Sequence, residues 1–334
     1  MDISVIVCTF NRHKSLARTL DSLVASTLPA SVEWEVIVVD NNSTDATPDL
    51  VRRYADAHPS RVRYVFEATQ GKSYSLNKAV RGARGAILAF ADDDVVVEPT
   101  WMWKLTQPLI EGRWSGVGGR VIPEWAAAPP RWIPFNERYG LAPLGVFNLG
   151  TAAGPLTEAP FGCNMAFRRS MFETHGLFRV DLGPCETSDG SPWQRGGLPI
   201  WTANRPPRMG EDSEFCQRLL DRGEALYYEP AAVVHHWVAA DRLRKQYFLA
   251  WWFEKGRAEV RQVGAKPGTR LYLGRIPAYH LRSMAVWTAR WLLGLGPRNR
   301  FRSKLLVWKK LGETLEFYRG MAKPPSGPRA EQAG

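Results

Sequence analysis

Three consecutive aspartates, Asp92, Asp93 and Asp94, end a short apolar run of the chain. Adjacent carboxylates repel one another unless a cation lies between them, and Mg²⁺ or Mn²⁺ binds one or two carboxylates together with substrate phosphates. Alternate residues of an extended chain lie on one side, so Asp92 and Asp94 are the natural pair to contact a metal ion and a ribose. A solvated acidic turn is the other interpretation of this cluster.

Two further acidic residues, Glu211 and Asp212, follow a glycine-rich stretch and open a segment with helical spacing. Acidic side chains at a helix N-terminus are stabilised by the helix macrodipole, and a role for Asp212 as an N-cap would explain the pattern. The same position suits a general base that removes the proton of an acceptor hydroxyl. The residues alone leave both interpretations open.

Two other motifs carry groups that could bind phosphate or metal. Residues 71–73 resemble the end of a P-loop, but Phe66 stands where that motif requires glycine, so the P-loop is rejected. Lys72 is then either a diphosphate contact or an exposed loop lysine. A histidine pair at residues 235–236 is either structural or, beside a carboxylate cluster, a source of a metal ligand. The sequence has no zinc-binding helix spacing and no nucleophile elbow.

These groups need a scaffold that brings them together, and the apolar pattern of the chain predicts one. Strand-like runs alternate with helical patterns, which is typical of βαβ units and of a mainly parallel sheet with helices on both faces. In such sheets, ligands bind beyond the carboxyl ends of the strands. The first strands are expected at residues 3–8, 35–39, 62–66 and 87–91.

Polar clusters follow three of these four strands, at residues 9–12, 40–43 and 92–94. Ordinary polar turns would explain each cluster singly, but their shared position predicts one binding edge. Thr44 or Asp45 is expected to cap the helix that follows the second strand. Further strands are expected at 161–167, 225–228 and 231–234, helices over 73–84, from 170 and over 211–222, and a mobile loop over 182–210.

The composition is that of a globular protein. The 334 residues are 45% hydrophobic and 23% charged, which excludes disordered, collagen-like and disulfide-scaffold proteins. No run of 18 apolar residues and no leader pattern at the start are present, so neither a transmembrane helix nor a signal peptide is expected. Four cysteines without CxxC spacing argue against structural zinc and fit a reducing cytosol.

The positive charge is concentrated at the end of the chain. Residues 241–334 contain 20 Lys and Arg against 6 Asp and Glu, whereas residues 1–240 contain 24 against 27. We therefore expect a separate functional unit over 1–240, and the family resemblance described below implies that it is a catalytic domain with a nucleotide-sugar-binding half over 1–120 and an acceptor half over 121–240. A helical region over 241–322 and a disordered tail over 323–334 are expected to follow.

The helical region has two amphipathic stretches. Arg275, Arg282 and Arg290 are expected on one side of the first, and residues 301–318 place an apolar stripe between basic side chains. Three interpretations remain: helices packed on the catalytic domain, an interfacial hairpin on an anionic membrane surface, and nucleic-acid binding. No nucleic-acid motif accompanies the charge, so nucleic acid is not an expected partner.

The order of these motifs resembles that of the family 2 glycosyltransferases, inverting enzymes with the GT-A nucleotide-diphospho-sugar transferase fold. The resemblance covers about residues 2–255, although residues 181–208 depart from the shorter family pattern. Residues 90–94 are similar to the metal-binding DxD motif, residues 210–214 to the ED motif, and His236 with Arg242 to the late His…Arg pattern. The remaining matches are residues 4–12, 38–45, 71–79 and 161–169.

The resemblance implies a role for each matched residue. Asp212 is the catalytic base and Glu211 binds acceptor or sugar hydroxyls. A divalent cofactor, Mn²⁺ or Mg²⁺, is held by Asp94, Asp92 and His236. The donor, a nucleotide-diphosphate sugar, is contacted by Thr9, Phe10, Asn11, Arg12, Asp40, Asn42, Lys72, Asn77, Asp92 and Asp93. The acceptor side consists of Gly162, Cys163, Asn164 and Glu211.

The resemblance also implies the reaction and its setting. A sugar passes from the donor to a hydroxyl of a lipid-linked sugar, glycan or other acceptor by metal-assisted single displacement. Cell-surface polysaccharide or glycolipid synthesis on the inner, cytoplasmic face of the membrane is expected. A nucleotidyltransferase is an alternative, but residues 9–12 lack its Gly-rich basic signature. Asp92, Asp94, Asp212 and His236 together argue against an inactive nucleotide-sugar-binding scaffold.

Overall fold

The computed structural model describes residues 1–134, 138–184, 209–294 and 296–320. The chain forms two compact units, residues 1–191 with 211–243 and residues 192–210 with 244–334. The loop expected over 182–210 and the tail expected over 323–334 lie mostly or wholly outside the described residues. Each unit is therefore described by itself.

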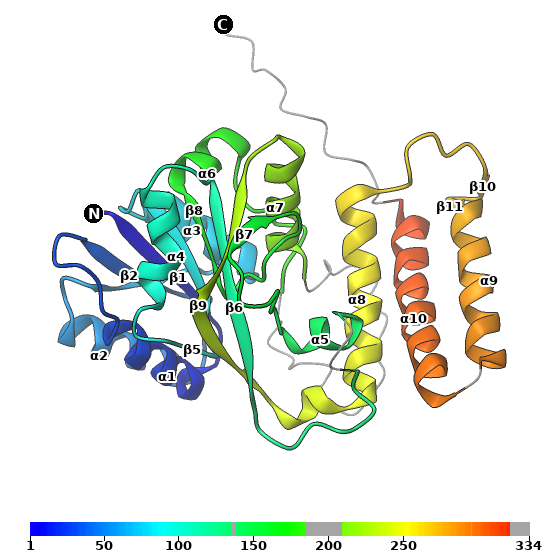
Figure 1. Cartoon of the computed structure of the whole chain (residues 1–334), viewed down its shortest axis with the longest axis horizontal. Coiled ribbons are helices and arrows are strands. Elements are labelled where there is room, and N and C mark those ends of the chain that lie inside the picture. Colours follow the sequence, from blue (N-terminus) through cyan, green and yellow to red (C-terminus); the bar gives the residue numbers. More distant parts are fainter. Residues whose placement is uncertain (135–137, 185–208, 295, 321–334) are drawn as a thin grey trace, which may run out of the picture. The chain divides into compact units, whose positions relative to one another are not determined.

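A parallel sheet forms the first part of unit 1 (Figure 1), with the strand order β3-β2-β1-β4. Every residue of β2 is buried, as expected for strands covered on both faces. All four strands agree with the predicted ones to within one residue. They are β1 (Ile3–Thr9), β2 (Trp34–Asp40), β3 (Val62–Phe66) and β4 (Ile87–Asp92).

Antiparallel neighbours extend this sheet into a mixed one whose longest pairings are parallel. The full order is β3-β2-β1-β4-β8-β6-β9-β5, with β7 also paired to β9. The β6–β9 pair is parallel, whereas the pairs that β8, β5 and β7 form are antiparallel. The added strands are β5 (Val95–Val97), β6 (Gly116–Trp125), β7 (Gly154–Leu156), β8 (Met165–Arg168) and β9 (Leu226–Val238).

Helices connect and cover these strands. The α1 helix buries Leu16, Leu20 and Leu23, which lie on one face of the helix. The predicted alternation of strands and helices is confirmed. The helices of unit 1 are α1 (His13–Val24), α2 (Thr47–Ala57), α3 (Lys72–Gly82), α4 (Trp101–Ile110), α5 (Arg138–Leu141), α6 (Arg169–His175) and α7 (Glu211–Asp221), with 3₁₀ turns η1 (Ala142–Leu144) and η2 (Ala240–Leu243).

Three predicted element boundaries are wrong. The strand expected from residue 161 begins at Met165, because residues 161–164 form a turn. The two strands expected around Pro230 are a single strand, β9, and the proline lies where its register with β6 shifts, a position that tolerates the missing donor. The α2 helix, which Thr44 or Asp45 was expected to cap, begins at Thr47, and its N-cap residue is Ala46. Asp45 Oδ1 accepts from the first helical amide, Thr47 N, at 2.9 Å.

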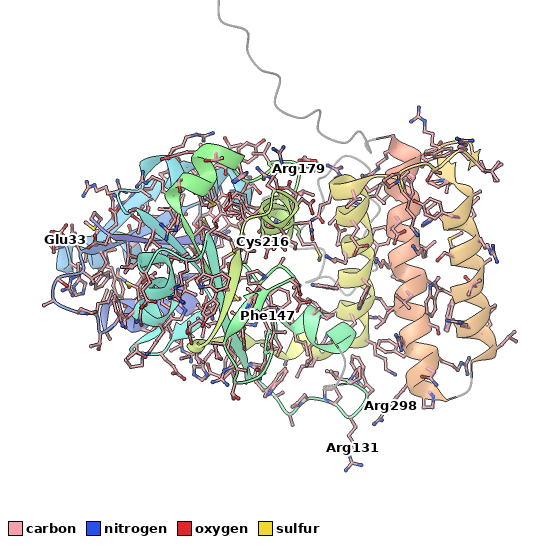
Figure 2. The ribbon with its side chains drawn as sticks, turned by 45° about the horizontal axis from the view of Figure 1, so that its top comes forward. Glu33, Arg131, Phe147, Arg179, Cys216 and Arg298 are labelled. Carbon is pink, nitrogen blue, oxygen red and sulfur yellow. The ribbon has the colours of Figure 1, made fainter. Side chains whose placement is uncertain are left out.

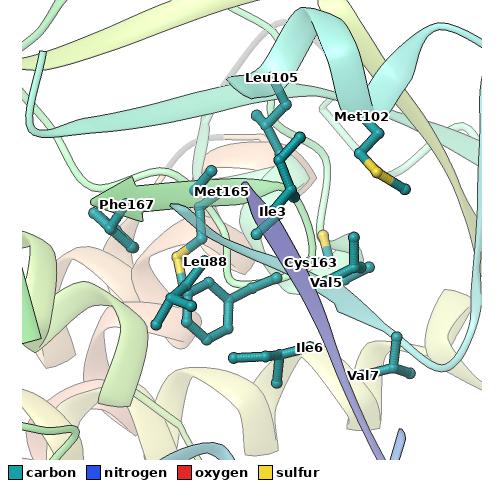
Figure 3. Close-up of a cluster of buried hydrophobic side chains, with 14 of the residues drawn as sticks. Ile3, Val5, Ile6, Val7, Leu88, Met102, Leu105, Cys163, Met165 and Phe167 are labelled. Carbon is teal, nitrogen blue, oxygen red and sulfur yellow. The ribbon is translucent and has the colours of Figure 1, made fainter. Parts of the chain in front are cut away.

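The core of unit 1 is apolar and aromatic, and it anchors the helix that carries the acidic pair. Figure 3 shows Ile3, Val5 and Leu88 packed with β8 side chains in this core. Phe215 of α7 is fully buried, and its ring stacks on that of Phe172, with 4.4 Å between the ring centroids. The start of α7 is thereby fixed one helical turn before this contact.

The described residues of unit 2 form three helices and a two-stranded turn. The α8 helix lies in the region predicted to be helical but was not predicted as a separate helix, whereas helices are present at the two predicted amphipathic stretches. Arg275 lies in the turn between β10 and β11, so its predicted place on α9 is wrong. None of the described helices combines the length and apolarity needed to cross a membrane. The elements are α8 (Lys245–Val263), β10 (Tyr272–Leu273), β11 (Ile276–Pro277), α9 (Ala278–Leu293) and α10 (Pro297–Arg319).

The α8 and α10 helices cross at two glycines. A Cβ atom on Gly256 would lie 2.1 Å from the carbonyl oxygen of Lys309, and one on Gly312 would lie 2.0 Å from that of Phe253. Both separations are far below van der Waals contact. The two backbones therefore approach more closely than any larger residue would allow.

Candidate active site

The polar clusters meet at one edge of the sheet. Thr9 at the end of β1 pairs in register with Asp40 at the end of β2, and Cys8 pairs with Asp92 at the end of β4. Parallel neighbours bring their carboxyl ends to the same edge, which is where α/β sheets bind ligands. The predicted convergence of the three clusters is therefore present.

Arg12 links two of the three consecutive aspartates. Its Nη1 atom lies 3.1 Å from Asp93 Oδ1 and 2.7 Å from Asp94 Oδ2. The hydroxyl of Thr9 donates to the other Asp93 oxygen at 2.8 Å. Burial raises the pKa of Asp93 to about 6, although Arg12 opposes it. The end of β1 thus supplies a hydroxyl to the acidic cluster, and the turn that follows it supplies a cation.

Lys72 neutralises the remaining aspartate. Its Nζ atom lies 2.6 Å from Asp92 Oδ1 and 3.8 Å from Glu211 Oε1. Burial lowers the pKa of Lys72, but the two carboxylates outweigh it and hold that pKa well above its ordinary value. Lys72 is therefore a charged site residue and not an exposed loop lysine. Asp92 and Asp94 have different partners here, so their joint action stays a prediction.

A small pocket joins the two acidic motifs. Its wall includes Cys8, Lys72, Asp92, Gly162 and Asp212. Glu211, Leu76, Phe90, Ala91 and Met165 complete the lining. Side chains from the ends of β1 and β4 thus share one cavity with the start of α7, although more than 100 residues separate these motifs in the sequence.

Asp212 is not an N-cap. The α7 helix begins at Glu211, and an N-cap side chain would accept from amides two or three residues further along. Instead, Asp212 Oδ2 accepts from Gly162 N at 2.8 Å and Oδ1 accepts from Ser213 N at 2.7 Å. A Cβ atom at residue 162 would lie 3.0 Å from Asp212 Oδ2, so glycine allows this approach. The carboxylate is held in a fixed orientation at the pocket.

Glu211 lies beside Asp212 and is almost completely buried, with 4% of its surface exposed. Burial and the charge of Asp212 raise the pKa of Glu211 to about 7, and Lys72 opposes the shift. The two adjacent acids therefore differ in environment: Asp212 faces backbone donors, whereas Glu211 is desolvated. Such a difference allows one carboxyl group to be protonated beside a carboxylate.

We expect the difference in free energy of unfolding between Glu211→Gln and the unsubstituted protein to change in favour of the variant as the pH rises from 5 to 8. Because the pKa of Glu211 is raised to about 7, the folded state keeps a proton that the unfolded state releases above the ordinary glutamate pKa of 4.5. The free energy of unfolding therefore falls with pH in this window, and glutamine removes that dependence. Thermal unfolding of Glu211→Gln and of the exposed control Glu173→Gln tests this. Parallel pH profiles for all three proteins would contradict it.

His236 and Arg242 surround Asp94 on its other side. Arg242 Nη2 lies 3.4 Å from Asp94 Oδ2, and His236 Nε2 lies 3.7 Å from Asp94 Oδ1. The pKa of Asp94 is raised by burial and lowered by His236, Arg12 and Arg242, which leaves it at about 2. Asp94 is therefore a carboxylate at neutral pH.

The imidazole of His236 is arranged as a neutral acceptor. Burial lowers its pKa, with Asp94 opposing and Arg242 reinforcing the shift. Its Nδ1 atom lies 3.1 Å from the carbonyl oxygen of Leu144, which can only accept, so Nδ1 carries the proton. The lone pair is then on Nε2, 3.0 Å from Arg242 Nη1. An imidazole oriented in this way can bind a metal ion.

Two of the three predicted metal ligands, Asp94 and His236, lie side by side. In the part of the chain that the structure describes, no three side chains among His, Cys, Asp and Glu converge as a ready metal site. Asp94 and His236 form a pair, which suits an ion that takes its other ligands from substrate phosphates and water. The predicted third ligand, Asp92, is occupied by Lys72.

Several predicted binding residues are instead part of the framework. Asn164 is fully buried: its Oδ1 accepts from Trp101 Nε1, and its Nδ2 donates to two backbone carbonyls. Asn77 exchanges two hydrogen bonds with the backbone of Phe178. Because both amides are buried and engaged on both atoms, we assign them to holding the site and not to contacting donor or acceptor. Cys163 is also buried, and burial raises the pKa of its thiol well above the usual value.

The turn after β2 is held by its own side chains. Asp40 is fully buried and accepts from Ser43 N and from the Tyr64 hydroxyl. Asn11 has a φ of 53° and Asn42 a φ of 65°, conformations that asparagine tolerates better than most residues. Asn11 Oδ1 accepts from Thr44 N, whereas Asn42 is exposed. Phe10 is half-buried in the turn after β1.

Asn41 is a site-forming residue that the sequence does not single out. Its Nδ2 donates to the carbonyls of Glu67 and Thr69, and its Oδ1 accepts from Gly71 N at 2.7 Å. These bonds fix the loop that delivers Lys72 to the pocket. In the sequence, the acidic neighbour Asp40 is the residue that suggests ligand binding. The backbone groups that Asn41 contacts are 26–30 residues away along the chain, so only the fold shows its role.

Comparisons with known proteins show which family the chain belongs to. The family model described as "Glycosyl transferase family 2" matches residues 4–176, just over half of the chain. A glucosyl-dolichyl phosphate glucuronosyltransferase of Haloferax volcanii is 28% identical over 241 residues, 71% of this chain and 69% of that protein. The succinoglycan biosynthesis protein ExoM of Rhizobium meliloti is 26% identical over 267 residues, 80% of this chain and 76% of that protein.

Solved structures show the same fold. The mannosyltransferase PcManGT from Pyrobaculum calidifontis, in complex with GDP-Man and Mn²⁺, matches with a TM-score of 0.55 at 21% identity, covering 96% of this chain and 86% of that one. GalNAc-T7 with UDP, GalNAc and Mn²⁺ matches with a TM-score of 0.51 at 18% identity, covering 78% of this chain and 50% of that one. These matches confirm the predicted GT-A fold class. Together with the family model and the curated relatives, they establish that the chain belongs to glycosyl transferase family 2 and is a glycosyltransferase.

Proposed function

We propose that this glycosyltransferase moves a sugar from a nucleotide-diphosphate donor to an acceptor hydroxyl with inversion of configuration. The observation that carries the proposal is the placement of Asp212. Its carboxylate is held by Gly162 N and Ser213 N at the wall of a pocket that also contains Lys72 and Asp92. A fixed carboxylate opposite cationic groups is what a single displacement at a sugar carbon requires.

In the proposed reaction, Asp212 takes the proton of the acceptor hydroxyl as its oxygen attacks the anomeric carbon. The bond from that carbon to the diphosphate oxygen breaks on the opposite face, and the nucleoside diphosphate leaves with the electron pair. Lys72, Arg12 and Arg242 lie among the aspartates and are the cations available to the diphosphate. They would stabilise the negative charge that develops on the leaving group.

A divalent ion, Mn²⁺ or Mg²⁺, fits the same site. Asp94 and His236 would hold it, with Asp92 as a further ligand if Lys72 moves to the diphosphate. The carboxylate form of Asp94 and the Nε2 lone pair of His236 support this assignment. When bound, such an ion would neutralise charge on the leaving diphosphate.

The relatives support an acceptor in polysaccharide or glycolipid synthesis. One is named for a dolichyl phosphate-linked sugar and another for succinoglycan biosynthesis. We therefore propose a lipid-linked sugar or glycan as the acceptor. A position in the cytoplasm, peripheral on an anionic membrane surface, would suit such an acceptor.

A thermal-unfolding screen with UDP, GDP, dTDP and CDP tests the donor class. We expect one nucleoside diphosphate to raise the unfolding temperature with Mn²⁺ or Mg²⁺ and to lose the effect in EDTA. A ligand at 100 times its Kd adds about 2.7 kcal/mol to the free energy of unfolding, which is readily measured. No response to any of the four, in either metal, would contradict the proposed donor site. A separate assay of sugar transfer by the unsubstituted protein distinguishes an enzyme from a binding protein. A product with inverted configuration would support the proposed reaction.

A further inference from the structure

A long segment of unit 2 has no acidic residue. Residues 260–312 contain 12 Lys and Arg and no Asp or Glu. This segment includes the whole of α9, the β10–β11 turn and the first two thirds of α10. Its charge can be balanced only by acids from elsewhere or by a partner.

The acids that flank this segment are paired with cations of unit 2, and half-buried Glu259 pairs with Lys309. Glu316 is fully buried between Arg257 and Arg261, at 2.7 and 3.1 Å. Glu313, buried beside α9, pairs with Lys310 at 2.6 Å. These buried acids neutralise cations between the helices. The exposed arginines of α9 are therefore available to a partner of opposite charge.

The outer side of α9 is both basic and apolar. Arg282 and Arg290 are exposed, and Leu292 and Leu293 expose 62% and 81% of their surfaces. Among the described residues of this helix only His280 is buried, against α10. In the turn before α9, Leu271 and Leu273 each expose 71%. Exposed leucines at both ends of a helix are unusual for a water-facing surface.

Half-buried indoles and cations alternate along the same helix pair. Arg290 lies over the Trp287 ring at 4.9 Å, and Lys304 lies 5.4 Å from the Trp291 ring and 5.3 Å from the Trp308 ring. Arg298 extends from the start of α10 (Figure 2) and is exposed. Indoles with nearby cations are typical of side chains at a membrane–water boundary.

We propose that the outer side of α9, with the β10–β11 turn, is a docking surface for an anionic lipid bilayer. This α9 surface consists of Leu271, Leu273, Arg282, Arg290, Leu292 and Leu293. The leucines enter the boundary between headgroups and acyl chains, and the arginines bind lipid phosphates. The inference rests on the membrane partner proposed above and not on the sugar-transfer step.

Exposed leucines favour a bilayer over nucleic acid. A nucleic-acid surface uses cations for phosphates and exposed aromatic rings for bases. In α9 and the turn before it, the indoles are half-buried and Tyr272 exposes 44% of its surface, less than the 62–81% that the four leucines expose. Aliphatic groups gain free energy by leaving water for lipid, but they have no partner on a phosphate backbone.

Sedimentation of the full chain with vesicles tests the surface. We expect binding to phosphatidylcholine vesicles that contain phosphatidylglycerol, and none to phosphatidylcholine alone. The double variant Leu292→Ser with Leu293→Ser and the double variant Arg282→Gln with Arg290→Gln should each weaken binding roughly tenfold. Arg81→Gln with Arg84→Gln removes two exposed charges from unit 1, and Ile110→Ser removes an exposed apolar side chain there. Both controls should bind as the unsubstituted protein does.

Hydrogen exchange of the unsubstituted chain gives a second readout that does not depend on the folding of any variant. We expect the anionic vesicles to slow exchange in α9 and in the β10–β11 turn. Absence of protection there, equal binding to both vesicle types, or unchanged binding of both double variants would overturn the proposal. Binding of an RNA oligonucleotide without vesicle binding would overturn it in favour of nucleic acid. No donor is present in these assays, so failure of the proposed reaction cannot produce any of these results.

Discussion

Asp212→Asn is expected to lower turnover by roughly 10²–10⁴-fold, the usual contribution of a positioned general base. Asparagine keeps the size of the side chain but cannot take the proton of the acceptor hydroxyl. Its amide can accept from either Gly162 N or Ser213 N but not from both, so a small rearrangement is also expected. The measurement is the initial rate of sugar transfer, together with the thermal shift that the nucleoside diphosphate produces.

The thermal shift should be unchanged in Asp212→Asn, because Asp212 faces the pocket and has no predicted contact with the diphosphate. Asp221→Asn is the matched control, since it makes the same substitution at the exposed end of the same helix. That variant should retain the full rate. Unchanged turnover in Asp212→Asn would remove the residue from its proposed role, and loss of both rate and shift would indicate a structural defect.

The second large effect is expected for Asp94→Asn, which should lose the metal-dependent part of nucleoside diphosphate binding. A divalent ion contributes several kcal/mol to transition-state stabilisation, and each 1.36 kcal/mol is a factor of about ten in rate. Turnover should therefore fall by roughly 10²–10³-fold. Binding of Mn²⁺, followed by electron paramagnetic resonance with the diphosphate present, measures the loss apart from the rate.

Asp94→Asn also removes the carboxylate between Arg12 and Arg242, so its unfolding temperature must be measured in parallel. Asp49→Asn is a suitable control, because Asp49 pairs with Arg52 on an exposed helix surface. That variant should bind Mn²⁺ normally. If Asp94→Asn kept the metal-dependent shift and the rate, Asp94 would be a counter-charge to the arginines and not a metal ligand.

The first half of the fold was predictable because three of its four strands, β1, β2 and β4, are buried on both faces. Such strands appear in the sequence as continuous apolar runs, and their ends are marked by polar turns, as at residues 9–12 and 92–94. The α8 helix was not predictable in this way. It buries Glu254, Arg257 and Arg261 in its interface, so charged residues occupy positions where an amphipathic pattern would show apolar ones.

Local motifs single out Asp212 and Lys72, and both side chains line the pocket, whereas their roles in sugar transfer stay predictions. Asn77 and Asn164 show the opposite case. Asn77 bonds to the backbone of Phe178, 101 residues away, and Asn164 links groups from β6, β9 and α4. An asparagine amide can form hydrogen bonds with a bound ligand or with backbone groups equally well. Which of the two it contacts depends on its position in the fold, and the local sequence does not give that position.

The three aspartates of the site form ion pairs with Lys72 and Arg12, so their charge is balanced without a bound metal ion. In many metal proteins the cluster of anionic ligands cannot assemble until the ion arrives, so the apo chain stays unfolded. Here the chain supplies its own positive charges within 3.1 Å of all three aspartates. These counter-charges belong to the chain itself and do not depend on a bound ion. A donor or metal ion that binds as proposed would therefore exchange ionic partners with Lys72 and Arg12.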